Sequence, residues 1–139
     1  MIRYLLDTNA CIGIIKGVPT MLRHRLLEKT PGEIAISQIV HYELMVGVCR
    51  SSRSERNRAN LMHFLKYIYV LDFGGDQADM AAKIRCDLLA KGQPIGPLDT
   101  LIAAHARSLN SILVTHNVSE FQRVDGLQLE DWESPYREK

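Results

Sequence analysis

The chain has 139 residues, long enough to bury a hydrophobic core and too short for two domains of ordinary size, so we expect one domain. Its 46% hydrophobic and 24% charged residues exclude a disordered or fibrous protein. The 17 basic residues nearly cancel the 16 acidic ones, and the formal net charge of +1 excludes a global basic field. Attraction to nucleic acid would therefore have to come from a local patch or from metal ions.

The cysteines and the N-terminus indicate where the protein works. Cys11, Cys49 and Cys86 are odd in number, widely spaced and each inside a predicted helix, which favours reduced thiols in a cytosolic protein. Asp7 and Asn9 interrupt the first apolar run, so it does not resemble a secretory signal, and no apolar run has the length of a membrane span. We expect a cytoplasmic protein without a membrane segment.

The first predicted element is a strand over residues 2–6 that ends abruptly at Asp7. Consecutive apolar residues of this kind are typical of a strand covered on both faces. Asp7, Thr8 and Asn9 then provide the short polar side chains that favour the start of a helix. Asp7 is therefore expected where a strand ends and a helix begins, and ligands bind at that edge of open α/β sheets.

Strands and helices alternate along the rest of the chain. We predict strands at residues 2–6, 33–37, 69–72, 111–115 and 127–129. Two helices separate each strand from the next up to the fourth, and a short turn at 119–122 precedes the fifth. This order predicts a single α/β domain with a five-stranded, mostly parallel sheet flanked by helices. Residues 134–139 form a polar tail.

Glu43 lies within the apolar stripe of the helix that follows the second strand. A carboxylate on the inward side of a helix is costly unless it is paired, hydrogen-bonded or bound to a metal. It cannot serve as a cap in mid-helix, so its structural alternative is a buried ion pair, for example with Arg85.

Two more candidates come later in the chain. Asp99 falls in the first turn of a helix over residues 98–109 that is apolar nearly all round, and Asn117 follows the fourth strand. Taken alone, Asp7 or Asp99 could simply stabilise a helix start, an effect of roughly 0.3–1 kcal/mol.

Together, these acids predict a metal site. Carboxylates gathered at one edge of a sheet repel one another and raise the pKa of at least one member unless a cation neutralises them. The chain has no Cys-x-x-Cys or His-x-x-x-His spacing, so oxygen ligands favour Mg²⁺ or Mn²⁺ over zinc. Such an ion suits phosphodiester hydrolysis, because it activates water and offsets charge on the leaving oxygen.

Other polar residues allow two interpretations. The four arginines of residues 50–58 fit a solvated loop and helix start better than a dedicated RNA-contacting patch. Metal-assisted hydrolysis needs no histidine as base, but His116 lies beside the proposed site and stays open as a substrate contact.

Four segments of the chain resemble the PIN-domain ribonucleases, and in particular the VapC toxins of bacterial toxin–antitoxin operons. These segments are residues 5–9, the mid-helix Glu43, residues 97–106, and residues 113–117 continuing to Phe121. The resemblance covers essentially the whole chain, with a PIN-like nuclease domain at residues 1–133.

This resemblance implies a Mg²⁺- or Mn²⁺-dependent endoribonuclease toxin that cuts structured RNA, often transfer RNA. It also implies a homodimer and a VapB-like antitoxin whose C-terminal segment covers the active site, with DNA bound only through the antitoxin. Asp7, Glu43 and Asp99 would be the metal-binding acids, and Thr8 and Thr115 hydroxyls near the site. Asn9 is a further supporting candidate.

One position departs from the family. Many members have an acid where this chain has Asn117, and either the Asn117 carbonyl or the nearby Glu120 could substitute for it. Three alternatives remain: a catalytically silent PIN-like module that binds RNA or protein, a metal-dependent DNase or flap-type nuclease, and a receiver-like phosphoacceptor. The last would need a lysine after a late strand, where the chain has Thr115, His116 and Asn117.

Overall fold

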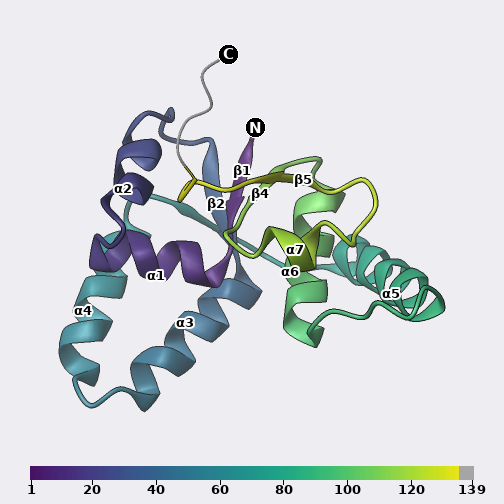
Figure 1. Ribbon diagram of the computed structural model, residues 1–139. Helices are drawn as coiled ribbons and strands as arrows, with labels where there is room; N and C mark the ends of the chain where they lie inside the picture. Colours follow the sequence, from purple (N-terminus) through teal and green to yellow (C-terminus); the bar gives the residue numbers. More distant parts are fainter. Residues whose placement is uncertain (135–139) are drawn as a thin grey trace.

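The computed structural model describes residues 1–134, so residues 135–139 of the predicted tail lie outside the described residues. One five-stranded sheet forms the centre of the molecule (Figure 1) in the order β3-β2-β1-β4-β5. All four neighbouring pairs are parallel. The strands are β1 (Tyr4–Leu6), β2 (Ile34–Ser37), β3 (Tyr69–Leu71), β4 (Ile112–Val114) and β5 (Gln128–Glu130). The predicted strands and the α/β architecture are thus confirmed.

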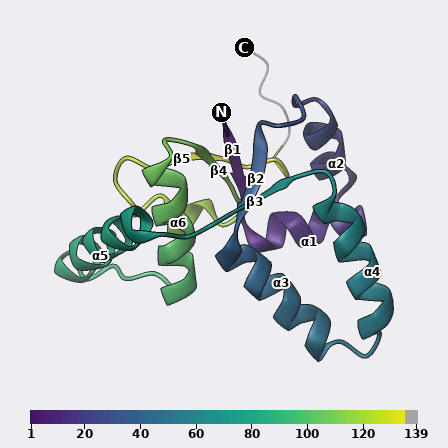
Figure 2. The same ribbon diagram turned by 180° about the vertical axis from the view of Figure 1, so that it is seen from behind.

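Helices cover both sides of this sheet. Figures 1 and 2 show α1 to α4 on one side of the strands and α5 and α6 on the other. The helices are α1 (Thr8–Lys16), α2 (Thr20–Leu27), α3 (Gln38–Arg50), α4 (Ser54–Leu65), α5 (Gly75–Ala90), α6 (Pro97–Ser108) and the short α7 (Val118–Phe121). No helix among residues 1–134 is long and apolar enough to cross a membrane.

The helix starts that frame the site follow from local sequence. The Asp7 carboxylate accepts a hydrogen bond from the Ala10 amide at 2.7 Å and so caps α1. The Ser37 hydroxyl accepts one from the Ile39 amide at 3.1 Å and caps α3. Pro97 occupies the first turn of α6, where its missing amide costs nothing. Each of these helices begins just beyond the strand or loop that positions it.

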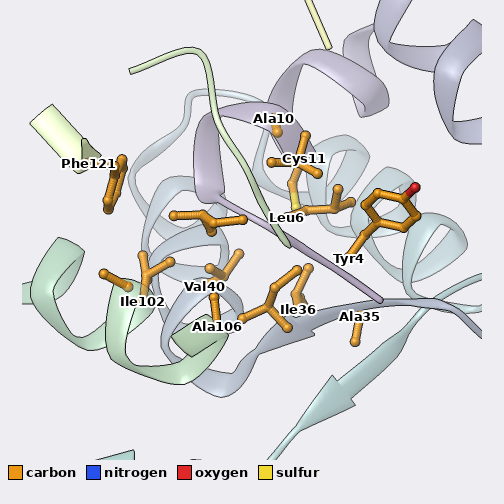
Figure 3. Close-up of a cluster of buried hydrophobic side chains, with 14 of the residues drawn as sticks. Tyr4, Leu6, Ala10, Cys11, Ala35, Ile36, Val40, Ile102, Ala106 and Phe121 are labelled. Carbon is orange, nitrogen blue, oxygen red and sulfur yellow. The ribbon is translucent and has the colours of Figure 1, made fainter. Parts of the chain in front are cut away.

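The core lies around β1, as Figure 3 shows, with side chains from α1, α3 and α6 packed against the strand. Leu5 and Leu6 are fully buried. Helix α6, which is apolar nearly all round, is deeply buried: Ile102 to Ala106 are all buried. Among the three free cysteines, Cys11 belongs to this core, whereas Cys49 and Cys86 are exposed. The tight packing fixes the strand ends, because a close-packed interior tolerates little displacement.

Candidate active site at the carboxyl ends of the strands

Asp7 lies at the centre of the candidate site. Its side chain is only 6% exposed. Burial raises the pKa of Asp7, although hydrogen bonds from the Thr115 hydroxyl and the Ala10 amide oppose this shift, and the charges of Glu133 and Glu43 add to it. Capping explains one hydrogen bond of this carboxylate, but it does not explain a buried acid close to two further acids.

Glu43 is half-buried on α3, and its Oε1 accepts a hydrogen bond from the Thr8 hydroxyl at 2.7 Å. It forms no ion pair within the part of the chain that the structure describes. The ion-pair alternative with Arg85 is therefore wrong: the Arg85 guanidinium donates to the Ile95 carbonyl at 3.5 Å. Thr8 fixes one oxygen of Glu43 and leaves the carboxylate without a compensating positive charge.

Asp99 is the most strongly perturbed acid of the site. Burial, the charge of Glu120, a hydrogen bond with Glu120, and the charges of Glu43 and Asp7 raise the pKa of Asp99 to about 7. Asp99 and Glu120 therefore lie in direct contact, and Glu43 and Asp7 are close enough to influence them. The predicted gathering of Asp7, Glu43 and Asp99 at one edge of the sheet agrees with this mutual repulsion.

Glu120 comes from α7 and lies beside Asp99. Its Oε1 accepts a hydrogen bond from the Gly96 amide at 3.2 Å, and its Oε2 accepts one from the Asn117 side-chain amide. Asn117 itself is exposed. Of the two candidates for the fourth position, Glu120 is the one whose carboxylate contacts Asp99. Asn117 instead donates a hydrogen bond to Glu120.

The supporting residues differ in how closely they meet the acids. Thr115 is buried, and its hydroxyl accepts a hydrogen bond from the Asn117 backbone amide at 3.0 Å. Thr8 contacts Glu43, and Thr115 contacts Asp7, as expected for hydroxyls near the site. Asn9 is exposed and forms no side-chain hydrogen bond with a residue of the described chain, so its predicted supporting role gains nothing here.

His116 joins two acids that the sequence reasoning overlooked. Its Nδ1 lies 3.0 Å from Asp131 Oδ2 and 3.4 Å from Glu133 Oε2. The hydrogen bond with Asp131 raises the pKa of His116, with a further contribution from Glu133. Both acids follow β5 just as Asp7 follows β1, and this shared position at the carboxyl end of a parallel strand was the signal available in the sequence.

The metal-ligand geometry separates these two groups. Among residues 1–134, only His116, Asp131 and Glu133 form a set of three whose potential ligand atoms all lie within 4.8 Å of one another. Asp7, Glu43 and Asp99 are less tightly gathered, as expected for carboxylates that repel one another. Mg²⁺ keeps several of its waters and binds through few carboxylates, so this spacing does not oppose it.

The donor set around Asp99 fits a hard divalent cation. Asp7, Glu43, Asp99 and Glu120 offer only carboxylate oxygens, and burial together with the charges of neighbouring acids raises the pKa values of Asp7 and Asp99. A cation among these oxygens would relieve the repulsion. Asp7, Glu43 and Asp99 with Glu120 are the residues that could hold such an ion.

Comparisons with known proteins show the family to which the chain belongs. The PIN domain family model matches residues 4–127. A relative from Shigella flexneri named tRNA(fMet)-specific endonuclease VapC is 42% identical, over 95% of this chain and 99% of its own length. Ribonuclease VapC2 from Rickettsia felis is 40% identical, over 94% of this chain and 98% of its own.

Solved structures give the same result at the level of the fold. The DNA-bound VapBC structure from Salmonella typhimurium contains a chain with a TM-score of 0.90 and 39% identity, covering 95% of this chain and 99% of that one. VapBC2 from Rickettsia felis, bound to a promoter DNA fragment, gives a TM-score of 0.87 and 38% identity, with coverage of 95% and 99%.

Proposed function

Because the chain belongs to the VapC family of PIN-domain proteins, we propose that it is the toxin of a type II toxin–antitoxin system and an endoribonuclease that depends on Mg²⁺ or Mn²⁺. The observation that carries the metal dependence is the contact between Asp99 and Glu120: burial, together with the charges of Glu120, Glu43 and Asp7, raises the pKa of Asp99 to about 7. Four acids in this arrangement destabilise the fold of the metal-free protein, and their oxygens are the ligands that a hard divalent cation prefers.

Asp7, Glu43, Asp99 and Glu120 would hold the cation. When bound, it supplies a water of lowered pKa as nucleophile and offsets charge on the leaving oxygen of a phosphodiester. The other residues position these acids: Thr8 orients Glu43, and Asn117 orients Glu120 together with the Gly96 amide. Such hydrogen bonds to ligating carboxylates typically change activity by about 10- to 100-fold.

The substrate and partners follow from the relatives. One relative is named for its action on a transfer RNA, and the two similar structures described above are VapBC complexes bound to DNA. We propose transfer RNA as the substrate class, a VapB-like antitoxin as the protein partner, and DNA bound only through that antitoxin. A homodimer and a cytoplasmic location complete the proposal.

Cleavage of transfer RNA by the purified protein tests this proposal. With Mg²⁺ or Mn²⁺ the protein should cleave, and a chelator or the substitution Asp99→Asn should lower the rate at least about 100-fold, as loss of a metal-bound carboxylate does. Asp79→Asn is the matched control, because Asp79 is an exposed acid on α5 away from the site. Its rate should equal that of the unmodified protein.

Three results would count against the proposal. Cleavage that persists in the presence of the chelator would contradict the metal dependence. Faster cleavage of single- or double-stranded DNA than of transfer RNA under the same conditions would favour a DNase. No cleavage under either metal would favour a silent binding module. That alternative rested on Asn117 in place of an acid, whereas Glu120 places a carboxylate beside Asp99, which supports the nuclease proposal.

A further inference from the structure

The turn between α3 and α4 concentrates positive charge. We call residues 50–58 the α3–α4 tip. Its four arginines and one glutamate give a formal charge of +3, whereas the whole chain has +1. The rest of the chain is therefore negative overall, and the tip is a local basic patch of the kind that the composition requires for attraction to nucleic acid.

The tip arginines do not stabilise the fold through polar side-chain contacts within residues 1–134. Arg50, Arg53, Arg56 and Arg58 are exposed, and none forms an ion pair or a side-chain hydrogen bond with a described residue. Arginines elsewhere bind carbonyl groups: Arg23 that of Ile14, Arg25 that of Asp131, Arg85 that of Ile95, and Arg123 that of Pro94. Four like charges left unpaired at one turn repel one another, which favours an external anion.

Helix α3 connects this tip directly to the acidic site. Glu43 and Arg50 are seven residues apart on α3, so they share a helix face and are separated by two turns, about 10 Å. Gly47 lies between them, and a Cβ atom at that position would meet nothing within 4 Å. Figures 1 and 2 show the α3–α4 turn at the end of α3 that points away from the sheet.

We propose that the α3–α4 tip binds the RNA backbone beside the cleavage site, with Arg50, Arg53 and Arg56 as the phosphate contacts. This inference rests on the proposed ribonuclease activity. The four acids of the active site repel RNA, and a bound cation compensates them only locally, so capture needs positive charge elsewhere. The planar guanidinium group binds phosphate oxygens in pairs, which suits this role.

The tip contributes affinity and little sequence preference. It contains no aromatic side chain on which a base could stack, and phosphate contacts carry no sequence information. The arginines should therefore act on any RNA of suitable shape. The acids act on the bond to be cut, and one of them, Glu43, lies about 10 Å from Arg50 along α3.

The triple variant Arg50→Gln/Arg53→Gln/Arg56→Gln tests the tip. For transfer RNA, KM should rise about tenfold at low salt while kcat stays within about twofold. The slope of log KM against log salt concentration should become shallower by about 2–3, because each lost phosphate contact removes 0.7–0.9. Thermal unfolding should be unchanged, because all three side chains are exposed.

Two controls test whether the positive charge accounts for the effect and whether the effect is specific to the tip. Replacing the same three arginines by lysine keeps the charge, so the salt slope should stay near that of the unmodified protein. Lys83→Gln removes an exposed charge from α5, on the other side of the sheet, and should leave KM unchanged. An equal rise in KM for Lys83→Gln would overturn the assignment to the tip.

Other outcomes also decide the matter. Unchanged KM and salt slope in the glutamine variant, with cleavage intact, would overturn the tip proposal and leave the ribonuclease standing. Weaker antitoxin binding with unchanged KM for RNA would assign the tip to the protein partner and overturn it as well. Absence of cleavage in the unmodified protein under either metal would instead remove the proposed function on which the tip proposal rests.

Discussion

The acidic site and the α3–α4 tip lie on the same helix and are built in opposite ways. Glu43, in the middle of α3, is half-buried and held by the Thr8 hydroxyl, whereas Arg50, at its end, is exposed and unpaired among the described residues. Fixed side chains suit chemistry, because a catalytic group must keep its geometry. Free side chains suit capture, because long-range attraction needs charge more than orientation.

This difference makes a general prediction about kinetics. Substitutions at the acidic site should lower kcat, because they disturb groups that act on the reacting bond. Substitutions at the tip should raise KM and change its salt dependence. Each of the following experiments either sharpens this separation or breaks it.

Among the experiments that follow, the largest effect is expected at Glu120. Glu120→Gln keeps the hydrogen-bonding shape but removes a carboxylate next to Asp99, and kcat should fall about 100-fold with little change in KM. Asn117→Ala should cost about 10-fold, because Asn117 only holds Glu120. Single-turnover cleavage of transfer RNA measures both. If Asn117→Ala proved as harmful as Glu120→Gln, Asn117 itself would supply the fourth ligand.

A smaller effect is expected at Thr8. Thr8→Val removes the 2.7 Å hydrogen bond to Glu43 while keeping the side-chain shape, and kcat should fall about 10-fold. Thr8→Ser keeps the hydroxyl and should retain nearly full activity. The salt slope of KM should be the same in all three proteins. A changed slope in Thr8→Val would mean that site and tip do not act separately.

The acidic site should also make stability depend on pH. The folded protein holds the pKa of Asp99 at about 7, above the ordinary 3.8, so this carboxyl favours folding at low pH. That contribution is lost as pH rises through about 7. The metal-free protein should therefore unfold at a lower temperature at pH 8 than at pH 5.

Two variants test the origin of this pH dependence. Asp99→Asn should flatten it, raising the unfolding temperature at pH 8 by roughly 3 °C, because a neutral amide avoids both the cost of a buried charge and the repulsion from the other acids. The glutamine variant of the tip should keep the profile of the unmodified protein. Thermal unfolding followed by circular dichroism in the presence of a chelator measures all three. An unchanged profile in Asp99→Asn would place the pH dependence elsewhere.

Most of the fold could be predicted from the sequence because its elements are marked locally. An apolar run ending at Asp7 defines β1, and Pro97 with the apolar residues after it defines α6. Glu43 could be recognised because a carboxylate within an apolar helical stripe needs a partner. Asp7 and Asp99 fit ordinary helix starts and stood out only when considered together with Glu43 and with the family resemblance. The parallel order of the strands then placed Asp7 at the correct edge.

The contacts between distant residues could not be predicted in this way. Glu120 reaches Asp99 and Gly96 only because the four-residue helix α7 turns it inward, and so short a helix has no periodicity to reveal its direction. Thr8 and Glu43 are 35 residues apart, so their hydrogen bond depends on the packing of α1 against α3. Asp131 and Glu133 had a visible signal, since they follow the fifth parallel strand, but only a consistent search of every strand end would have found them.

The central claim is that the repelling carboxylates around Asp99 form a cation site. An NMR titration of the Asp99 carboxyl carbon, with and without Mg²⁺, tests it most directly. The account predicts a pKa of about 7 in the metal-free protein and a clear decrease when Mg²⁺ is added. An ordinary carboxyl pKa in both titrations, or one that Mg²⁺ leaves unchanged, would contradict it.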